Sequence, residues 1–233
     1  MAIEKPVGIR LGTANAYLLP AQKGYVLIDA GNAGQQGKLF DLLERHGVSP
    51  REVFLVVVTH VHYDHVGGLR AIVERSCARV LVHEAEADLL RHGKASPAAG
   101  ATFYGKVIRA VGSLVAVGRL GFQPCRPDLV VAGDTPLRVL GLDGTVLHTP
   151  GHSAGSLSVL LDNGDAFVGD LCMNAFPLGR GPIFPPFADS AEALYASWAR
   201  LLDAGARRIF PGHGKPFAAE VLRKRVKQTP MRG

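Results

Sequence analysis

Metal-binding side chains gather in one short segment in the first third of the sequence. The segment His60-Val61-His62-Tyr63-Asp64-His65 contains four groups that can bind a divalent cation. It follows the apolar run Val53–Thr59, which is rich in β-branched residues and too short for a typical helix, so this run predicts a buried strand. Imidazole and carboxylate groups suit zinc and also iron or manganese. These features predict a metal site in a loop that leaves a strand.

The spacing within this loop predicts how its ligands divide between ions. Alternate residues of an extended loop project in the same direction, so His60 and His62 can bind one ion together. Asp64 and His65 lie one step further along the chain and can reach a second ion. The alternative is a polar turn that happens to be rich in histidine. Three of the nine histidines in the chain lie in this loop, which favours the metal site.

Three later positions combine a strand end, a neighbouring glycine and a metal-binding side chain. They are His152, Asp170 and His213, next to Gly151, Gly169 and Gly212. Glycine beside a ligand lets the backbone approach closely and adopt unusual angles. With the first loop, these positions bring the candidate ligand side chains to seven, which suffices for two ions if Asp170 bridges them.

Hydrophobic periodicity predicts strands and helices in both halves of the chain. In the N-terminal half we expect strands at 15–19, 25–29, 53–59 and 79–82 and helices at 38–46, 68–75 and 84–91. In the C-terminal half we expect strands at 129–132, 137–140, 145–148, 156–161, 166–168 and 208–210. Asp189 and Glu192 resemble a capping box that opens a further helix. Because both halves repeat this order, the pattern predicts two facing sheets with helices outside and a site at a shared edge.

Length and composition are those of one globular domain. The 233 residues can bury a full core, and we expect a single domain over 1–233 with a helical insert at about 93–123. No apolar run approaches the length of a membrane span and the chain starts without a secretion signal, so we expect no membrane partner. The three cysteines lack the pair spacing of a metal site and indicate reduced thiols in a cytoplasmic protein.

The net charge of +6 raises the question of a nucleic-acid partner. Much of the excess lies in the segment Arg223–Lys227 near the C-terminus. No aromatic residues interleave with these charges, and the sequence contains no known nucleic-acid-binding motif. A solvated helix end explains the run better, so nucleic acid is not the expected partner.

Five segments together resemble the motifs of the metallo-β-lactamase superfamily, and the resemblance extends over essentially the full chain. They are Leu27–Gly31, Thr59–His65, Thr149–His152, Gly169–Asp170 and Pro211–Gly214. The combination is far more specific than any single segment. It implies an α/β (α+β) fold, a four-layer αββα sandwich of two mixed β-sheets with helices on the outer faces. It also implies a binuclear metal site in a cleft between the sheets.

The resemblance implies a role for each candidate ligand. The first ion would be held by His60, His62 and His152 and the second by Asp64, His65 and His213, with Asp170 as the bridge. The two ions are expected to be zinc, with iron or manganese as alternatives. Asp29 matches a position of the superfamily whose side chain does not bind the metal but supports the site. Such partners orient the ligand imidazoles by hydrogen bonding to them.

Other polar residues near these motifs are assigned outside the metal positions. His83 and His148 end strands near the cluster, and we expect each to donate a supporting hydrogen bond rather than to bind metal. Ser153 and Ser156 have no catalytic triad around them, which argues against serine catalysis.

Two adjacent divalent ions can bridge a water molecule, lower its pKa towards neutrality and polarise a substrate oxygen. The predicted function is therefore binuclear metal-dependent hydrolysis of an ester, thioester or lactone in a small-molecule substrate. The catalytic candidates are Asp170, as the bridge, and Asp64, as a ligand that can also accept a proton. The candidate substrate contacts are Tyr104, in the insert, and Arg180, in a proline-rich loop. The apolar insert could equally form the face of a homodimer.

Several related activities share part of this ligand pattern. Di-zinc β-lactamases place a cysteine at the position of Asp170, which argues against β-lactam hydrolysis. Glyoxalase II and acyl-homoserine lactonases share the ligand types, although we expect the C-terminal thiol-binding domain of glyoxalase II to be absent. The main alternative is a persulfide dioxygenase-like enzyme, because those enzymes keep the motifs but bind one iron with three residues. A phosphodiesterase or nuclease and a non-catalytic metal-binding protein are further alternatives.

Overall fold

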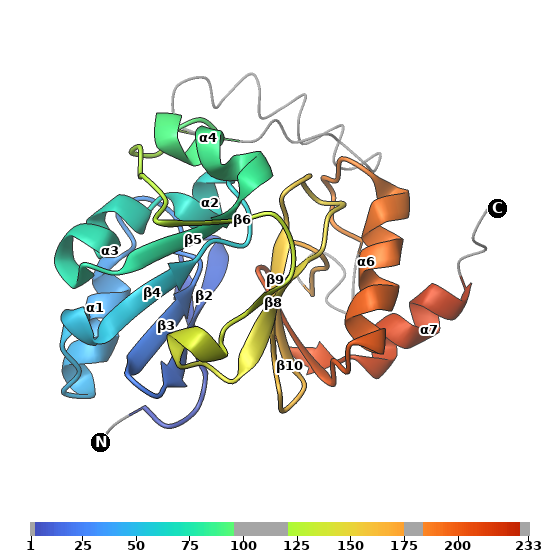
Figure 1. The fold of residues 1–233 in the computed structure, drawn as a ribbon, viewed down its shortest axis with the longest axis horizontal. Helices are drawn as coiled ribbons and strands as arrows, with labels where there is room; N and C mark the ends of the chain where they lie inside the picture. The colour runs from blue at the N-terminus through green and yellow to red at the C-terminus, as the bar shows by residue number, and fades with distance from the viewer. Residues whose placement is uncertain (1–2, 96–120, 175–183, 229–233) are drawn as a thin grey trace.

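The computed structural model describes residues 3–95, 121–174 and 184–228. They form an α/β sandwich in which two six-stranded sheets face each other and helices cover the outer faces (Figure 1). This confirms the architecture expected from the sequence. Most of the expected insert, including Tyr104, lies outside the described residues, and so does Arg180. Within the described ranges, no helix is both long and apolar enough to cross a membrane.

The first sheet contains six strands in sequence order. They are β1 (Val7–Leu11), β2 (Ala14–Ala21), β3 (Gly24–Ile28), β4 (Val53–Val57), β5 (Arg79–His83) and β6 (Leu129–Val131). The first three strands pair antiparallel, whereas β3 to β6 run parallel. Because β3 and β4 are parallel neighbours, the residues that follow them, including Asp29 and His60, emerge at the same edge of the sheet.

The C-terminal strands form the second sheet, in which each strand again lies next to its neighbours in the sequence. They are β7 (Thr135–Pro136), β8 (Gly144–His148), β9 (Leu157–Leu161), β10 (Asp165–Gly169), β11 (Arg208–Pro211) and β12 (Phe217–Ala218). All neighbours are antiparallel except β10 and β11, which are parallel. Asp170 and His213 follow these two parallel strands and therefore also emerge at one edge.

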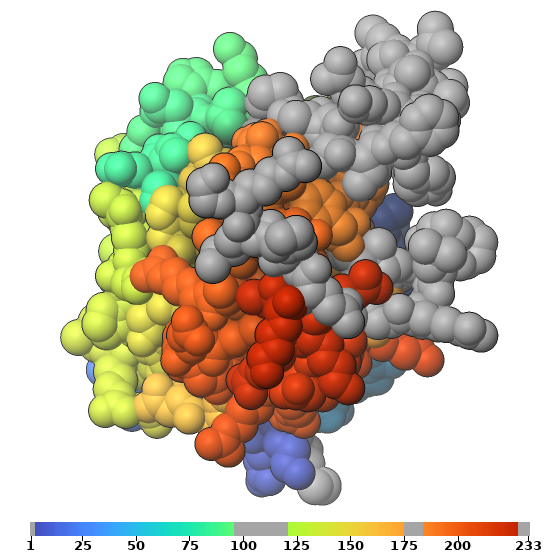
Figure 2. All heavy atoms as spheres, turned by 90° about the vertical axis from the view of Figure 1, so that its right-hand side faces the viewer, coloured from blue at the N-terminus to red at the C-terminus, as the bar shows by residue number. Residues whose placement is uncertain are grey.

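Helices form the two outer layers. They are α1 (Gly37–Arg45), α2 (Tyr63–Val66), α3 (Leu69–Ser76), α4 (Glu84–His92), α6 (Ala191–Asp203) and α7 (Glu220–Gln228). The helices α1, α3 and α4 lie over the first sheet in Figure 1, and α6 and α7 lie on the side of the second. Figure 2 faces this second side, where the adjacent α6 and α7 make up much of the surface.

Apolar side chains fill the three spaces between these layers. Leu39, Leu69 and Leu90 belong to the cluster between the first sheet and its helices. Trp198 of α6 belongs to the cluster on the second sheet. A third cluster, which includes the fully buried Phe167, joins the two sheets. Apolar burial contributes about 25 cal/mol per Å², so these clusters are the main source of the free energy that holds the four layers together.

The expected strand at 137–140 is wrong. The strand β7 lies earlier, and Arg138–Leu140 forms a 3-10 turn that ends at Gly141, whose φ is 83°. Leu137 is fully buried, but Val139 is 87% exposed. The apolar residues of this segment therefore do not share a buried sheet face, although their spacing suggested one.

The start of α6 also differs from the expectation. Its N-cap is Ser190, whose hydroxyl accepts the Ala193 backbone N–H at 3.1 Å, rather than Asp189. The Asp189 backbone N–H donates to the His152 carbonyl at 3.2 Å. Asp189 therefore remains part of the contact with a ligand loop, and the helix begins one residue later.

Candidate metal centre

The structure brings all seven candidate ligand side chains together at the shared edge of the two sheets. They come from four loops: His60, His62, Asp64 and His65 from the segment between β4 and α3, His152 after β8, Asp170 after β10, and His213 after β11. Residues up to 153 positions apart thus meet because their strands end side by side. All are buried except His62 and His213, which are partly exposed.

The ligand atoms form two adjacent sets. In the first set, the ring nitrogens of His60, His62 and His152 lie within 4.8 Å of one another. In the second set, Asp64, His65 and His213 satisfy the same limit. The distance from His213 Nε2 to Asp64 Oδ2 is 3.3 Å. Each set therefore offers three donor atoms around one point.

Asp170 lies between the two sets. Its Oδ1 is 3.3 Å from His65 Nε2. Its Oδ2 is 3.4 Å from His213 Nε2 and 3.8 Å from His152 Nε2. Donor atoms bound at 2.0–2.1 Å to one tetrahedral zinc ion lie about 3.4 Å apart. These distances are therefore compatible with cations shared through the Asp170 carboxylate.

Unpaired polar atoms test whether the residues fit a metal ion. His60 Nε2, His65 Nε2 and Asp170 Oδ1 are buried and form no hydrogen bond of normal geometry among the described residues, although the last two face each other at 3.3 Å. Buried polar atoms in native proteins are nearly always paired. Three unpaired atoms in one cluster of imidazole and carboxylate donors are the arrangement that a divalent cation would satisfy, so the residues fit the predicted ions.

Hydrogen bonds on the outer side of the rings orient the Nε2 atoms towards the centre. His65 Nδ1 donates to Asp29 at 2.8 Å. His152 Nδ1 donates to the Phe187 carbonyl at 2.8 Å, and His213 Nδ1 donates to the Thr13 carbonyl at 3.0 Å. In a neutral ring, a donor proton on Nδ1 leaves the lone pair on Nε2, which is the tautomer that binds metal through that atom.

Asp29 supports two ligands at once. Its carboxylate accepts the Thr59 backbone N–H and the Thr59 hydroxyl, both at 2.8 Å, in addition to the His65 ring. Thr59 Oγ1 in turn lies 3.1 Å from His60 Nδ1. Asp29 has a φ of 59°, a left-handed conformation that is uncommon outside glycine and that places the carboxylate at this junction. This geometry is compatible with the supporting role expected for Asp29.

Burial makes the first set electrically neutral. It is the largest cause that lowers the pKa of His60 well below its usual value, and neighbouring imidazoles add to this effect. Burial and the nearby His152 lower the pKa of His62 to about 3. Burial also lowers the pKa of His152. Without an ion, these three rings are therefore uncharged at neutral pH.

Carboxylates make the second set charged. Burial favours neutral rings, but the charge of Asp170 outweighs it and raises the pKa of His65 well above its usual value. The same opposition raises the pKa of His213 to about 10. Burial works against ionised Asp64, yet its hydrogen bond to His213 lowers its pKa to about 2. Without an ion, the second set therefore consists of carboxylates paired with protonated imidazoles.

Glycine at position 212 keeps the centre open. A Cβ atom on Gly212 would lie 2.5 Å from Asp170 Oδ1 and 2.6 Å from His65 Cε1. Any side chain there would enter the space between the donor atoms. Gly212, which we expected to allow close approach of the backbone, is thus required because there is no space for a side chain at this position.

His148 does not contact the candidate ligands directly. Its ring stacks on His83, with 4.1 Å between centroids and 16° between planes. Its Nε2 lies 2.9 Å from the Ala154 carbonyl. His83 Nδ1 accepts the Ala85 backbone N–H and so caps α4. The hydrogen bonds of these two histidines therefore organise backbone beside the site, and neither reaches a ligand ring among the described residues.

Two polar residues at the site were not expected from the sequence. The hydroxyl of Thr13, in the turn between β1 and β2, lies within hydrogen-bond distance of two acceptors, Asn32 Oδ1 at 2.9 Å and Asp64 Oδ2 at 3.2 Å. Glu86, in α4, is 2% exposed and accepts hydrogen bonds from Val61 and Ser153. The available signal for Glu86 was its place beside Ala87 on the buried face of an amphipathic helix. No local pattern marked Thr13.

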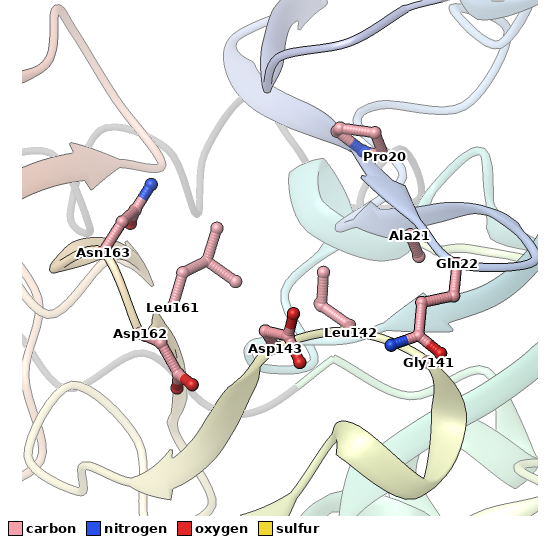
Figure 3. A pocket seen from close by; sticks show the side chains of 9 residues that line it. All are labelled: Pro20, Ala21, Gln22, Gly141, Leu142, Asp143, Leu161, Asp162 and Asn163. Atoms are coloured by element: carbon pink, nitrogen blue, oxygen red, sulfur yellow. The ribbon is translucent and has the colours of Figure 1, made fainter.

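A separate hollow lies at the end of β2 that is far from the ligand cluster. Figure 3 shows the side chains that line it. It has a volume of about 490 Å³ and is lined by residues 20–22, 141–143 and 161–163. The strand β2 runs from the ligand edge to this hollow. Two carboxylates there, Asp143 and Asp162, form ion pairs with Arg138. The hollow therefore lacks the unpaired donors that mark the metal centre.

Known proteins share both sequence and fold with this chain. The sequence model of the metallo-beta-lactamase superfamily matches residues 9–213 of this chain. Acyl-coenzyme A thioesterase MBLAC2 of Bos taurus is 29% identical over 224 residues, covering 90% of this chain and 76% of that protein.

Two solved structures are similar over nearly the whole chain. TTHA1623 in a di-iron-bound form has a TM-score of 0.63 at 28% identity, covering 93% of this chain and 95% of that one. The archaeal protein ST1585 from Sulfolobus tokodaii has a TM-score of 0.68 at 21% identity, covering 100% of this chain and 88% of that one, which shows the fold alone. The match over residues 9–213 shows that this chain belongs to the metallo-beta-lactamase superfamily and is a hydrolase of that superfamily.

Proposed function

We propose that this hydrolase cleaves thioesters of small-molecule substrates, with esters and lactones as related substrates, by means of two divalent metal ions. The observation that carries the proposal is the position of Asp170, whose two carboxylate oxygens face donors of both sets. Similarity to a protein named acyl-coenzyme A thioesterase favours the thioester among the three substrate classes.

The two donor sets correspond to the two proposed ion positions. His60, His62 and His152 would hold one ion and Asp64, His65 and His213 the other, with Asp170 shared. When bound, such ions supply Lewis acidity, which polarises an acyl carbonyl and makes hydroxide available from water near neutral pH. Zinc is the proposed metal, with iron or manganese as alternatives; the di-iron form of TTHA1623 shows that a similar chain binds iron.

The carboxylates of this chain orient the site and handle charge. The low pKa of Asp64 keeps it ionised at neutral pH, and the ionised form both binds a cation and accepts a proton at Oδ2. The Thr13 hydroxyl and the His213 ring, both next to Oδ2, restrict its direction. Asp29 holds the His65 ring from behind, so that its Nε2 faces Asp170.

The test uses the full chain stripped of metal by a chelator and reloaded in turn with zinc, iron or manganese. Metal per chain is measured by mass spectrometry. Hydrolysis is measured on short- and long-chain acyl-coenzyme A, a nitrophenyl ester, an acyl-homoserine lactone and a phosphodiester. We expect two ions per chain and thioester hydrolysis that is lost on chelation and restored on reloading.

Other outcomes would replace this proposal with one of the alternatives. A single iron per chain, together with oxygen uptake on a persulfide substrate, would identify a dioxygenase-like enzyme. Preference for the phosphodiester would identify a phosphodiesterase. A fully loaded protein that is inert on the whole panel would contradict hydrolysis of these substrate classes.

A further inference from the structure

Glu86 is a buried carboxylate that has no part in the proposed ligand set. It lies in the first turn of α4 and is 2% exposed. A buried carboxylate is costly unless its oxygens accept hydrogen bonds. The neighbouring Glu84 lies on the same helix but is exposed. The difference between these two glutamates calls for a role that is specific to position 86.

The two oxygens of Glu86 reach the two loops that carry the first donor set. Oε2 accepts the backbone N–H of Val61, the residue between His60 and His62. Oε1 accepts the hydroxyl of Ser153, the residue after His152. One carboxylate thus joins segments that are 92 positions apart in the sequence, next to all three imidazoles of the first set.

The loop that follows His152 is shaped around this carboxylate. The Ser153 hydroxyl lies 2.8 Å from the Ser156 hydroxyl, and the Ser153 backbone N–H donates to Ser156 Oγ at 3.0 Å. A Cβ atom on Gly155 would lie 2.5 Å from Glu86 Cγ, so this position needs glycine for lack of space. Of the two serines that were excluded as nucleophiles, Ser153 therefore donates to Glu86, and Ser156 holds Ser153 in place.

The helix that carries Glu86 is itself anchored at its start. His83 caps α4 by accepting the Ala85 backbone N–H at 3.2 Å, and its ring stacks on His148 of β8. The N-terminus of a helix stabilises a negative charge in its first turn. Glu86 therefore projects from an element fixed to both sheets, which gives its carboxylate a defined position relative to the two loops.

We infer that Glu86 is a positioning residue, which holds the His60–Val61–His62 loop and the His152–Ser153 loop at the spacing that the first donor set needs to bind its metal ion. The inference rests on the proposed metal centre. The hydrogen bonds of Glu86 reach neither Asp64 nor His213 among the described residues, so its effect is specific to the first set.

The experiment is a competitive zinc titration of the metal-free full chain against a chromophoric chelator, which resolves the two binding steps. His62→Ala and His213→Ala identify the step that belongs to each donor set. Glu86→Gln keeps the shape of the side chain but turns one acceptor oxygen into a donor that faces another donor. Glu84→Gln is the matched control, because it removes an exposed carboxylate from the same helix.

We expect Glu86→Gln to weaken the step that His62→Ala removes by about 10–100-fold, the usual effect of losing a partner behind the ligands. The step assigned by His213→Ala should not change, and Glu84→Gln should match the parent protein in both steps. The cobalt(II)-loaded protein gives a second readout. Glu86→Gln should alter the visible absorption of the ion in the first set, which a role in fold stability alone would leave unchanged.

Equal weakening of both steps, or no weakening, overturns the role of Glu86. If His62→Ala leaves both zinc steps intact, the proposed metal centre is wrong and the inference fails with it, so the two failures are distinguishable. If the Glu86→Gln protein does not fold, Ser153→Ala is the test of the inference, because it removes only one of the hydrogen-bond donors to Glu86. It should weaken the same step by up to about tenfold, and an unchanged first step overturns the inference.

Discussion

The two donor sets of the metal centre lie side by side but are built differently. The first consists of three imidazoles, and the second combines a carboxylate with two imidazoles. Burial keeps the first set neutral without an ion, whereas paired charges hold protons on His65 and His213 in the second. A cation entering the first set meets neutral imidazoles, but one entering the second must displace protons from charged ones.

The residues behind the two sets differ as well. In the second set, Asp29 and Thr13 form hydrogen bonds with the candidate ligand side chains themselves. In the first set, Glu86 bonds a backbone N–H and a serine hydroxyl next to the ligands. The geometry of the first set thus depends mainly on the placement of loops, and that of the second on the pairing of charges. Substitutions behind one set should therefore affect the metal affinity of that set more than that of the other.

Removal of the shared carboxylate should have the largest effect, because it disrupts both sets. Asp170→Ala should lower metal-dependent turnover by at least about 10³-fold, since the loss exceeds that of a single transition-state donor. His152→Ala should also abolish turnover, and circular dichroism should show an intact fold for both. Asp143→Ala, in the distant hollow, is the control. A decrease of less than about tenfold for Asp170→Ala would contradict its place between the two sets.

The pH dependence of metal affinity should separate the two sets. The raised pKa values of His65 and His213 mean that both rings carry protons at neutral pH, so affinity of the second set should rise with pH. The expected slope between about pH 6.5 and 8.5 is about tenfold per pH unit for each displaced proton. The first set, whose pKa values are lowered, should show little slope. Calorimetric titration in buffers of different ionisation enthalpy counts the protons, and equal slopes for both sets would disprove the difference.

Neutralising the residue behind His65 should have an intermediate effect. Asp29→Asn removes the negative charge that accepts the His65 proton and replaces an oxygen next to Thr59 with a donor. Metal affinity of the second set should fall by about 10–100-fold, with a smaller change in the first set through Thr59. Zinc competition measures both steps. Asp41→Asn, an exposed change in α1, should leave them unchanged.

Removal of the Thr13 hydroxyl should have the smallest effect. Thr13→Val keeps the backbone carbonyl that accepts the His213 ring and removes the hydroxyl, with its contacts to Asp64 Oδ2 and Asn32 Oδ1. One such bond contributes about 1 kcal/mol, so turnover should fall by less than about tenfold. Thr13→Ser should restore the rate measured for the parent protein. A failure of serine to restore it would assign the effect to packing rather than to the hydroxyl.

The candidate ligands could be found from the sequence because each lies in a short motif of strand, glycine and polar side chain. The strands β4, β8, β10 and β11 were expected for the same reason, since their apolar runs are local. Of the residues behind the ligands, Asp29 lies in such a motif, whereas Glu86 and Thr13 could not be found in this way. Glu86 is 67 positions from Ser153, and Thr13 is 51 positions from Asp64, so neither contact leaves a local pattern.

The elements that escaped prediction also depend on distant partners. The edge strands β1 and β12 were not expected, and each is defined by pairing with one neighbour. The helical turn α2 starts inside the segment expected to be a loop. Residues 137–140 had the composition of a strand, but Leu137 is buried in the core between the sheets, Leu140 packs against that core only in part, and Val139 is exposed.

By itself, the sequence determined which side chains could bind metal and on which strand ends they stand, because residue type and local periodicity are properties of short segments. The tertiary structure alone decided that Asp170 faces both donor sets and that Glu86 joins two of the loops. It also decided which imidazoles are neutral and which carry a positive charge when no ion is bound. The physical reason is that burial and charge pairing depend on neighbours brought together by the packing of the two sheets, and no short segment contains those neighbours.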